Sequence, residues 1–183
     1  AKQSEDPFYS VEDDYLHTKN SIKELVDAYI LIKAATSELA PQKDIVLSPW
    51  DSHHRYGIHD GNYIQNPLTV LPCSLSYING RYWRSTYASS NTIFSQSSTI
   101  RKHFYQFETL AKNYPNVTED HTINTLYYTD STKYTPDPNS TINLYSPIPS
   151  LAYHVSYEDI PNLNPEGCSW KELWDNISEE DLK

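Results

Sequence analysis

The chain has 183 residues, a length that suits one domain with a substantial hydrophobic core. Asp and Glu outnumber Lys and Arg by 24 to 14, giving a formal charge of −10. Such an acidic chain argues against nucleic acid or an anionic membrane as a partner, because both require a basic surface. The sequence also lacks an apolar run of about 18 residues that could span a bilayer, and it lacks glycine-rich nucleotide loops and a G-x-S-x-G motif.

The first part of the chain indicates a helix followed by a short strand. Residues 1–12 are polar, and we expect them to be flexible. Apolar residues recur near helical spacing over 13–28, which predicts an N-terminal helix there. The apolar run 29–34 is rich in β-branched residues and predicts a strand. Three prolines interrupt 37–68, for which we expect irregular structure.

From residue 70 onward the pattern is typical of β-structure. Asn79-Gly80 is the strongest hairpin signal in the chain, and it predicts a turn between strands at 73–78 and 82–87. The alternation of side chains over 102–110 predicts a further strand. The remaining expected elements are strands at 91–96, 121–129, 140–146 and 150–156, and an amphipathic helix at 169–182.

This order of elements predicts a closed β-structure. Short strands at regular spacing, with proline in the connections, indicate a sandwich or a barrel. We therefore expect one mainly β domain, an eight-stranded antiparallel up-and-down barrel with an N-terminal helix and a C-terminal helix. A barrel of this size is wide enough to hold one small ligand.

Several features favour a secreted protein. The chain contains no Met and begins at Ala1, which is consistent with removal of a signal peptide. Three N-glycosylation sequons begin at Asn116, Asn139 and Asn176. In an oxidising compartment Cys73 and Cys168, the only cysteines, would form a disulfide. The alternative is two unrelated buried thiols.

Several segments resemble, in the right order, the tick salivary lipocalins of the histamine-binding-protein family. Residues 21–36 resemble the first helix and strand of that family, and Leu71-Pro72 with 77–86 resembles its early hairpin. The segments that resemble the last three strands and the exit into the C-terminal helix are 126–130, 142–147 and 157–161, followed by Cys168.

The resemblance implies a secreted barrel that sequesters a ligand and modulates host immune defence. In the family, a cysteine on an early strand bridges to a cysteine after the last strand, and Cys73 and Cys168 fit that pair. The family's second bridge is missing, so the chain would be a divergent member. The cholesterol-binding, dendritic-cell-modulating branch of the Japanin type would fit.

The alignment also bears on the ligand. Amine-binding members carry inward-facing acids on the last three strands, because a buried cation needs carboxylates around it. The corresponding residues here, Asn124, Ile142 and Leu151, are uncharged. We therefore expect a sterol such as cholesterol, or another lipid, although plain core packing is the alternative for each residue. The other expected lining residues are Trp83, Tyr105, Phe107, Leu126, Tyr128, Leu144 and Tyr153.

Other functions have weaker signals. The 16 tyrosines suit a surface that binds a host protein, such as an immune-cell receptor or a complement component. An eicosanoid scavenger would need a cation, and Arg84, Arg101, Lys102 and His154 are available; an amine scavenger would need the missing acids.

We expect no catalytic residues, no cofactor and no metal site. No nucleophile with a matching base emerges from the sequence. The polar stretch containing His53, His54, His59 and Asp60 matches no standard metal site, and we interpret it as a solvated loop.

Overall fold

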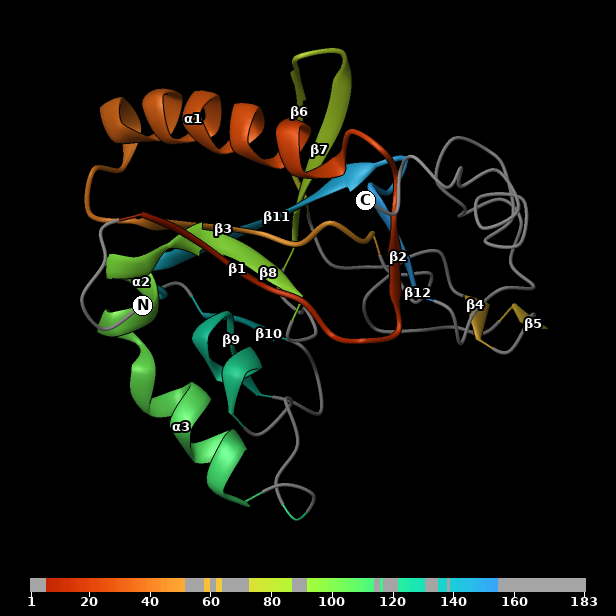
Figure 1. Ribbon diagram of the computed structural model, residues 1–183. Helices are drawn as coiled ribbons and strands as arrows, with labels where there is room; N and C mark the ends of the chain where they lie inside the picture. Colours follow the sequence, from red (N-terminus) through yellow and green to blue (C-terminus); the bar gives the residue numbers. More distant parts are fainter. Residues whose placement is uncertain are drawn as a thin grey trace.

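A six-stranded mixed sheet forms the centre of the computed structural model (Figure 1). The structure describes residues 6–51, 58–59, 62–63, 73–86, 92–113, 116, 122–130, 135–137 and 139–154. Strands β3 and β11 pair in parallel, and every other neighbouring pair in this sheet is antiparallel. In spatial order the strands are β1 (Pro7–Ser10), β8 (Ile93–Gln96), β3 (Asp44–Leu47), β11 (Ile142–Ile148), β7 (Arg81–Thr86) and β6 (Leu75–Ile78).

Shorter elements surround this sheet. The two-stranded pairs are β2 (Tyr15–His17) with β12 (Ala152–His154), β9 (Tyr128–Asp130) with β10 (Thr135–Pro136), and β4 (Ile58–His59) with β5 (Asn62–Tyr63). The helices are α1 (Ser21–Leu39), α2 (Ser97–Lys102), α3 (Phe104–Asn113) and the 3₁₀ helix η4 (Ile123–Leu126). Among the helices described, none combines the length and the apolar character needed to cross a lipid bilayer.

The expected eight-stranded antiparallel barrel is wrong. The central sheet is open, with β1 and β6 at its two edges, and its central pair β3–β11 is parallel. An up-and-down barrel contains only antiparallel neighbours and has no edges. The physical reason for the open sheet is that helices cover both of its faces, so that closure is not needed to bury its apolar side chains.

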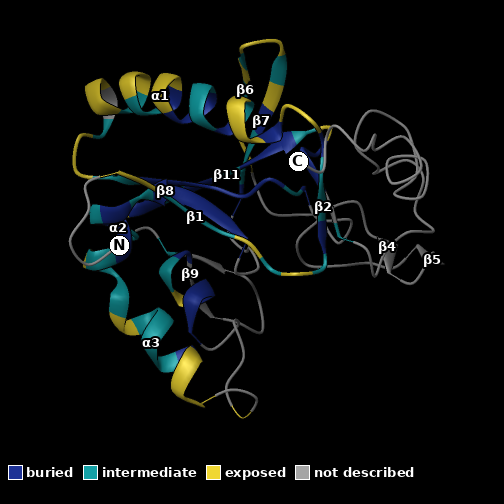
Figure 2. Cartoon of the chain, viewed as in Figure 1, coloured by how far each residue is buried: buried dark blue, intermediate teal, exposed yellow. Residues whose placement is uncertain are grey.

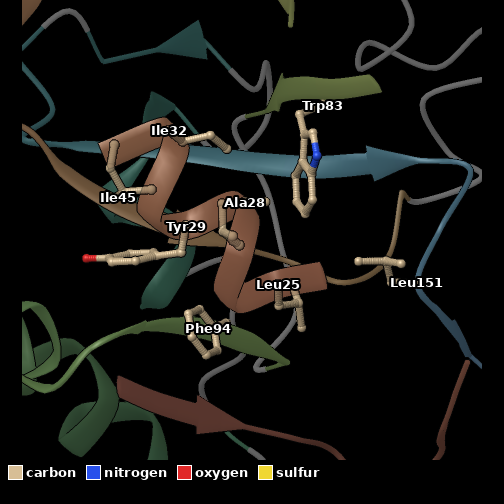
Figure 3. Packing of buried hydrophobic residues seen from close by; sticks show 9 residues of the cluster. Leu25, Ala28, Tyr29, Ile32, Ile45, Trp83, Phe94 and Leu151 are labelled. Atoms are coloured by element: carbon tan, nitrogen blue, oxygen red, sulfur yellow. The ribbon is translucent and has the colours of Figure 1, made fainter. Parts of the chain in front are cut away.

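The first of two apolar clusters lies between α1 and the sheet. Leu25, Ala28, Tyr29 and Ile32 of α1 point toward residues of the strands beneath, as Figure 3 shows. Trp83 of β7 is the largest fully buried side chain there, with 1% of its surface exposed. The strand and loop residues of this cluster are Ile45, Leu47, Trp83, Phe94 and Leu151.

The second cluster lies on the opposite face, beneath α2, α3 and η4. Val46, Ile93, Ile142 and Leu144 supply its sheet side, and the helices contribute residues such as Leu110. Figure 2 shows the central strands buried, while one side of α1 is exposed. Because consecutive strand residues point to opposite faces, β3 contributes apolar residues to both clusters, whereas β11 contributes Ile142 and Leu144 to the second.

Strand β3 lies within the segment expected to be irregular. Its three consecutive residues Ile45, Val46 and Leu47 are all buried, the first and third toward α1 and the middle one toward the second cluster. Continuous apolar runs are typical of strands that are covered on both faces. The prolines on either side of this run favoured a prediction of irregular structure.

The strand expected at 29–34 is also wrong, because α1 continues through it to residue 39. Tyr29 and Ile32 extend the stripe begun by Leu25 and Ala28, a spacing of three and four residues that places all four on one helix face. Packing of this stripe on the sheet overrides the local β propensity. Ile30 and Leu31 are left on the solvent side, 60% and 49% exposed.

The strand expected at 102–110 is replaced by the end of α2 and most of α3. Phe107 and Leu110 pack into the second cluster at helical spacing, while Tyr105 points outward. In α3 the buried residues recur every three or four positions on one side of the helix. In a strand, every second residue would have been buried.

Several expectations are confirmed. The hairpin β6–β7 turns at Asn79 and Gly80, both with positive φ. Strand β8 lies within the strand expected at 91–96, and β11 overlaps the strand expected at 140–146. The stretch 121–129 is only partly strand, because η4 precedes β9. Residues 7–10, expected to be flexible, form β1. The expected C-terminal helix at 169–182 lies outside the described residues.

Candidate functional site

Of the two hollows lined by described residues, the larger has a volume of about 320 Å³ and lies at the beginning of β11, and we call it the β11 hollow. It forms where β7 ends beside β11, next to the turn that leads from α1 into β3. Three backbone hydrogen bonds hold the surrounding segments: Asp44 N donates to Thr141 O at 2.7 Å, Ser140 N to Asp137 O at 3.1 Å, and Asp137 N to Tyr127 O at 3.1 Å.

The lining of the β11 hollow combines polar and aromatic residues. Two residues carry opposite charges, Lys43 and Asp137. The uncharged polar members are Ser74, Ser85, Thr86, Ser140 and Asn143, and the apolar and aromatic members are Tyr127, Ile142, Leu144 and Tyr145. A small set of polar groups that converge on an apolar wall is typical of small-molecule sites.

Tyr127 is the most informative member of the lining. Only 3% of its surface is exposed, yet within the described part of the chain its hydroxyl group has no hydrogen-bond partner. Burial raises the pKa of this hydroxyl group, so it stays protonated and can donate. A buried phenol normally finds a partner, and this one lines a hollow instead.

A second hollow of about 280 Å³ adjoins the first. It lies between the C-terminal half of α1 and strand β6, and it shares Asn143 and Tyr145 with the β11 hollow. Its other lining is mainly small or aliphatic, including Ala35, Ala40 and Ile78. The two hollows therefore meet on either side of the first residues of β11.

A buried polar cluster lies farther along β11 and supports the sheet. Asp51 is 2% exposed and forms an ion pair with Arg84 of β7, with Oδ2 and Nη2 separated by 3.3 Å. Ser146 Oγ donates to Asp51 Oδ1 at 2.8 Å, and the backbone N–H of Asp51 donates to Ser150 Oγ at 2.9 Å. Arg84, considered above as a cation for a lipid carboxylate, thus binds a carboxylate of the chain itself.

The residues expected to line a barrel do not meet in one cavity. Trp83 and Leu151 are core residues beneath α1, while Phe107 and Leu126 pack against the second cluster. Asn124 is buried in η4, and Tyr105 is 74% exposed on α3. Only Ile142 and Leu144 line the β11 hollow. The side chains of Tyr128 and Tyr153 lie outside the described part.

The other expected sites are described only in part. Cys73 is exposed immediately before β6, and Cys168 lies outside the described residues, so the disulfide stays a prediction. Asn116 and Asn139 are exposed, and Asn176 also lies outside. Of the histidine-rich loop only the backbone of His59 is described. In the described ranges, no three metal-binding side chains cluster closely enough to hold an ion.

Comparisons with known proteins identify no relative: no family model, no curated protein and no solved structure matches the chain.

Sequence reasoning missed most of the β11 hollow. Lys43, Tyr127, Asp137 and Asn143 lie in turns or on a strand whose neighbours are distant in sequence, and no local motif joins them. One signal was present: the Pro-Asp-Pro-Asn stretch at 136–139 is a strong turn sequence just before a strand, and it places Asp137 at the entrance to β11.

Proposed function

We propose that this chain is a binding protein that holds a small molecule in the β11 hollow. The observation that carries the proposal is Tyr127, a buried residue that lines the hollow and whose hydroxyl group forms no hydrogen bond in the described part of the chain. A volume of about 320 Å³ lies at the lower end of the range for small-molecule sites.

The hollow favours a smaller and more polar ligand than a sterol. The sterol expectation depended on the apolar interior of a closed barrel, and the open sheet replaces that interior with two clusters of packed side chains. The lining of the β11 hollow includes hydroxyl, amide and charged groups as well as Tyr127, Ile142 and Leu144. Such a lining suits a molecule with several hydrogen-bonding groups and a modest apolar part.

Secretion is part of the same proposal. Asn116 and Asn139 of two sequons are exposed, so an oligosaccharide could be attached to either without unfolding the chain. The chain produced in a secretory host should lose mass on treatment with a glycosidase specific for N-linked glycans. An unchanged mass would contradict glycosylation at these sites.

The experiment for ligand binding is a fragment screen followed by NMR with the full chain. We expect hits to shift resonances of Tyr127, Asn143 and neighbouring residues of the hollow. Tyr127→Phe keeps the ring and removes the hydroxyl group, so it should weaken binding by about 3- to 10-fold, the value of one hydrogen bond. Tyr105→Phe, on the exposed face of α3, is the matched control. Hits confined to other surfaces would contradict the proposal.

A second candidate function is the binding of a host protein through the β6–β7 hairpin. Leu75, Tyr77 and Tyr82 are 59%, 67% and 53% exposed on one face of this hairpin. The rings of Tyr77 and Tyr82 lie with centroids 5.0 Å apart, directly across the two strands. Figure 1 shows the hairpin extending past α1. Strand β6, which carries Tyr77, is an edge of the sheet, and an edge strand with exposed tyrosines on and beside it suits a partner that adds a strand of its own.

Affinity capture from host plasma tests this second function. A specific partner should be retained by the wild-type chain and lost with the double substitution Tyr77→Ser and Tyr82→Ser. Tyr105→Ser removes an equally exposed tyrosine from α3 and should retain it. Equal capture by all three proteins would exclude the hairpin as the binding surface.

A further inference from the structure

The charges of the β11 hollow define the chemistry of its ligand. This step rests on the function proposed above, and we infer that the ligand is a small zwitterion, specifically a free α-amino acid with an apolar or aromatic side chain. The juxtaposition that carries the inference is Lys43 and Asp137 in one hollow beside an apolar wall.

Lys43 supplies a positive charge that the protein leaves available. It lies in the turn between α1 and β3, where its backbone N–H donates to Ala40 O at 3.1 Å. The neighbouring acid, Asp44, directs its carboxylate elsewhere: Oδ2 lies 2.8 Å from Lys102 Nζ and 3.5 Å from His103 Nε2. Within the described ranges, the Lys43 ammonium group has no ion pair. Lys43 is a half-buried residue that lines the hollow, so its ammonium group is available to bind a carboxylate of a ligand.

Asp137 supplies the opposite charge from another segment. Its Oδ1 accepts a hydrogen bond from the backbone N–H of Asn139 at 2.8 Å, which fixes the carboxylate at the turn before β11. Its Oδ2 accepts no hydrogen bond from any residue that the structure describes. One carboxylate oxygen is therefore held in place while the other can accept from an ammonium group.

The two charges do not neutralise each other. Both line the β11 hollow, but in the described structure no ion pair joins Lys43 to Asp137. A ligand with one carboxylate and one ammonium group could pair with both at once, and each pairing would be strengthened by hydrogen bonds between charged groups. A ligand with only one charge would leave one of the two side chains facing an uncharged part of the ligand.

The overall charge of the chain points in the same direction. At −10 the protein repels a free anion before it reaches Lys43, whereas an α-amino acid carries no net charge near pH 7. The uncharged wall of Tyr127, Ile142 and Leu144 lies in the same hollow and would receive the ligand's side chain. The Tyr127 hydroxyl group can donate to the ligand carboxylate.

Isothermal titration with three matched probes tests the inference. L-Phenylalanine carries both charges, phenethylamine lacks the carboxylate, and 3-phenylpropionate lacks the ammonium group. We expect L-phenylalanine to bind at least 10-fold more tightly than either of the others. L-Leucine and L-tyrosine extend the panel to an aliphatic and a hydroxylated side chain.

Two substitutions assign the charges. Lys43→Gln should remove the preference for L-phenylalanine over phenethylamine, and Asp137→Asn should remove the preference over 3-phenylpropionate. Asp137→Asn keeps an Oδ1 that can accept from Asn139, so the turn should be preserved, and thermal melting checks this. Lys112→Gln and Asp27→Asn alter charges on the exposed faces of α3 and α1, and should leave all three affinities unchanged.

The outcomes separate this inference from the proposed function. If 3-phenylpropionate binds as tightly as L-phenylalanine and Asp137→Asn has no effect, the site takes simple anions and the inference is overturned. If fragments bind in the β11 hollow while none of the amino acids does, the inference is again overturned and the proposed function stands. If no molecule binds in the hollow, both are overturned.

Discussion

The hydroxyl group of Tyr9 in β1 and Nε2 of His17 in β2 form a hydrogen bond, and the two rings meet edge to face with centroids 5.6 Å apart. The bond joins an edge strand of the central sheet to the separate β2–β12 pair. Nε2 can accept from the Tyr9 hydroxyl group or donate to its oxygen, according to the tautomer of the imidazole.

The burial of His17 at this contact predicts that the protein loses stability in mild acid. Burial lowers the pKa of His17 below 6.5, although a hydrogen bond to the backbone of Tyr15 acts in the opposite direction. The unfolded chain therefore takes up the proton first, and stability falls as the pH drops from about 6.5 through the pKa of the folded state. The urea midpoint measured between pH 7.5 and 5 should fall less steeply for His17→Gln. Equal slopes would exclude His17 as a contributor.

The conformation of the β6–β7 turn predicts how much stability the substitution Gly80→Ala removes. Gly80 has φ of +85° and Asn79 has φ of +50°, as the favoured two-residue hairpin turns require. A Cβ added at Gly80 would meet no atom within 4 Å, so the cost of Gly80→Ala is backbone strain alone. We expect a loss of about 1–2 kcal/mol in the free energy of unfolding. A change near zero would show that the turn adopts another conformation.

Trp83 and Tyr105 give opposite predictions for two residues that the sequence placed in one ligand wall. Trp83 is 1% exposed beneath α1, so Trp83→Ala should cost about 3–5 kcal/mol. Tyr105 is 74% exposed, and Tyr105→Ala should change stability by no more than about 0.5 kcal/mol. Denaturant unfolding measures both. Similar costs would favour a shared environment for the two side chains.

The ion pair between Asp51 and Arg84 predicts strong coupling. Asp51→Ala leaves the guanidinium group in a site where its side chain is only 15% exposed, and should cost about 3–5 kcal/mol. Replacing both residues, with Asp51→Leu and Arg84→Met, should recover much of that loss because no buried charge remains. A double-mutant cycle gives the coupling free energy. A double variant less stable than Asp51→Ala would contradict this account.

The parts of the fold that could be predicted are those set by local chemistry. The two-residue hairpin turn requires positive φ at both central residues, and Asn79 and Gly80 are residue types that adopt it readily. A strand was likewise expected at 140–146, and β11 overlaps it. These signals lie within a few residues of one another, so no knowledge of distant partners was needed.

The parts that could not be predicted depend on distant partners. The run 29–34 has strand-like residues, yet Tyr29 and Ile32 become helical because the sheet supplies a surface for one face of α1. The pairing of β3 with β11 in parallel joins residues about a hundred positions apart, and no sequence pattern specifies it. The β11 hollow follows from that pairing, because Lys43 precedes β3 and Asp137 precedes β11.

The position of β11 in the sequence also affects when the central sheet can be completed during synthesis. This strand lies between β3 and β7 and is hydrogen-bonded to both, so in the described structure it completes the backbone hydrogen bonding between the two parts of the sheet. On the ribosome, β1, β3 and β8 can associate early, and α1 can pack against them and against Trp83, but the sheet stays in two parts until this late segment emerges. Such long-range closure slows folding. A nascent chain arrested before Ile142 would hold two halves of a sheet without the strand that unites them.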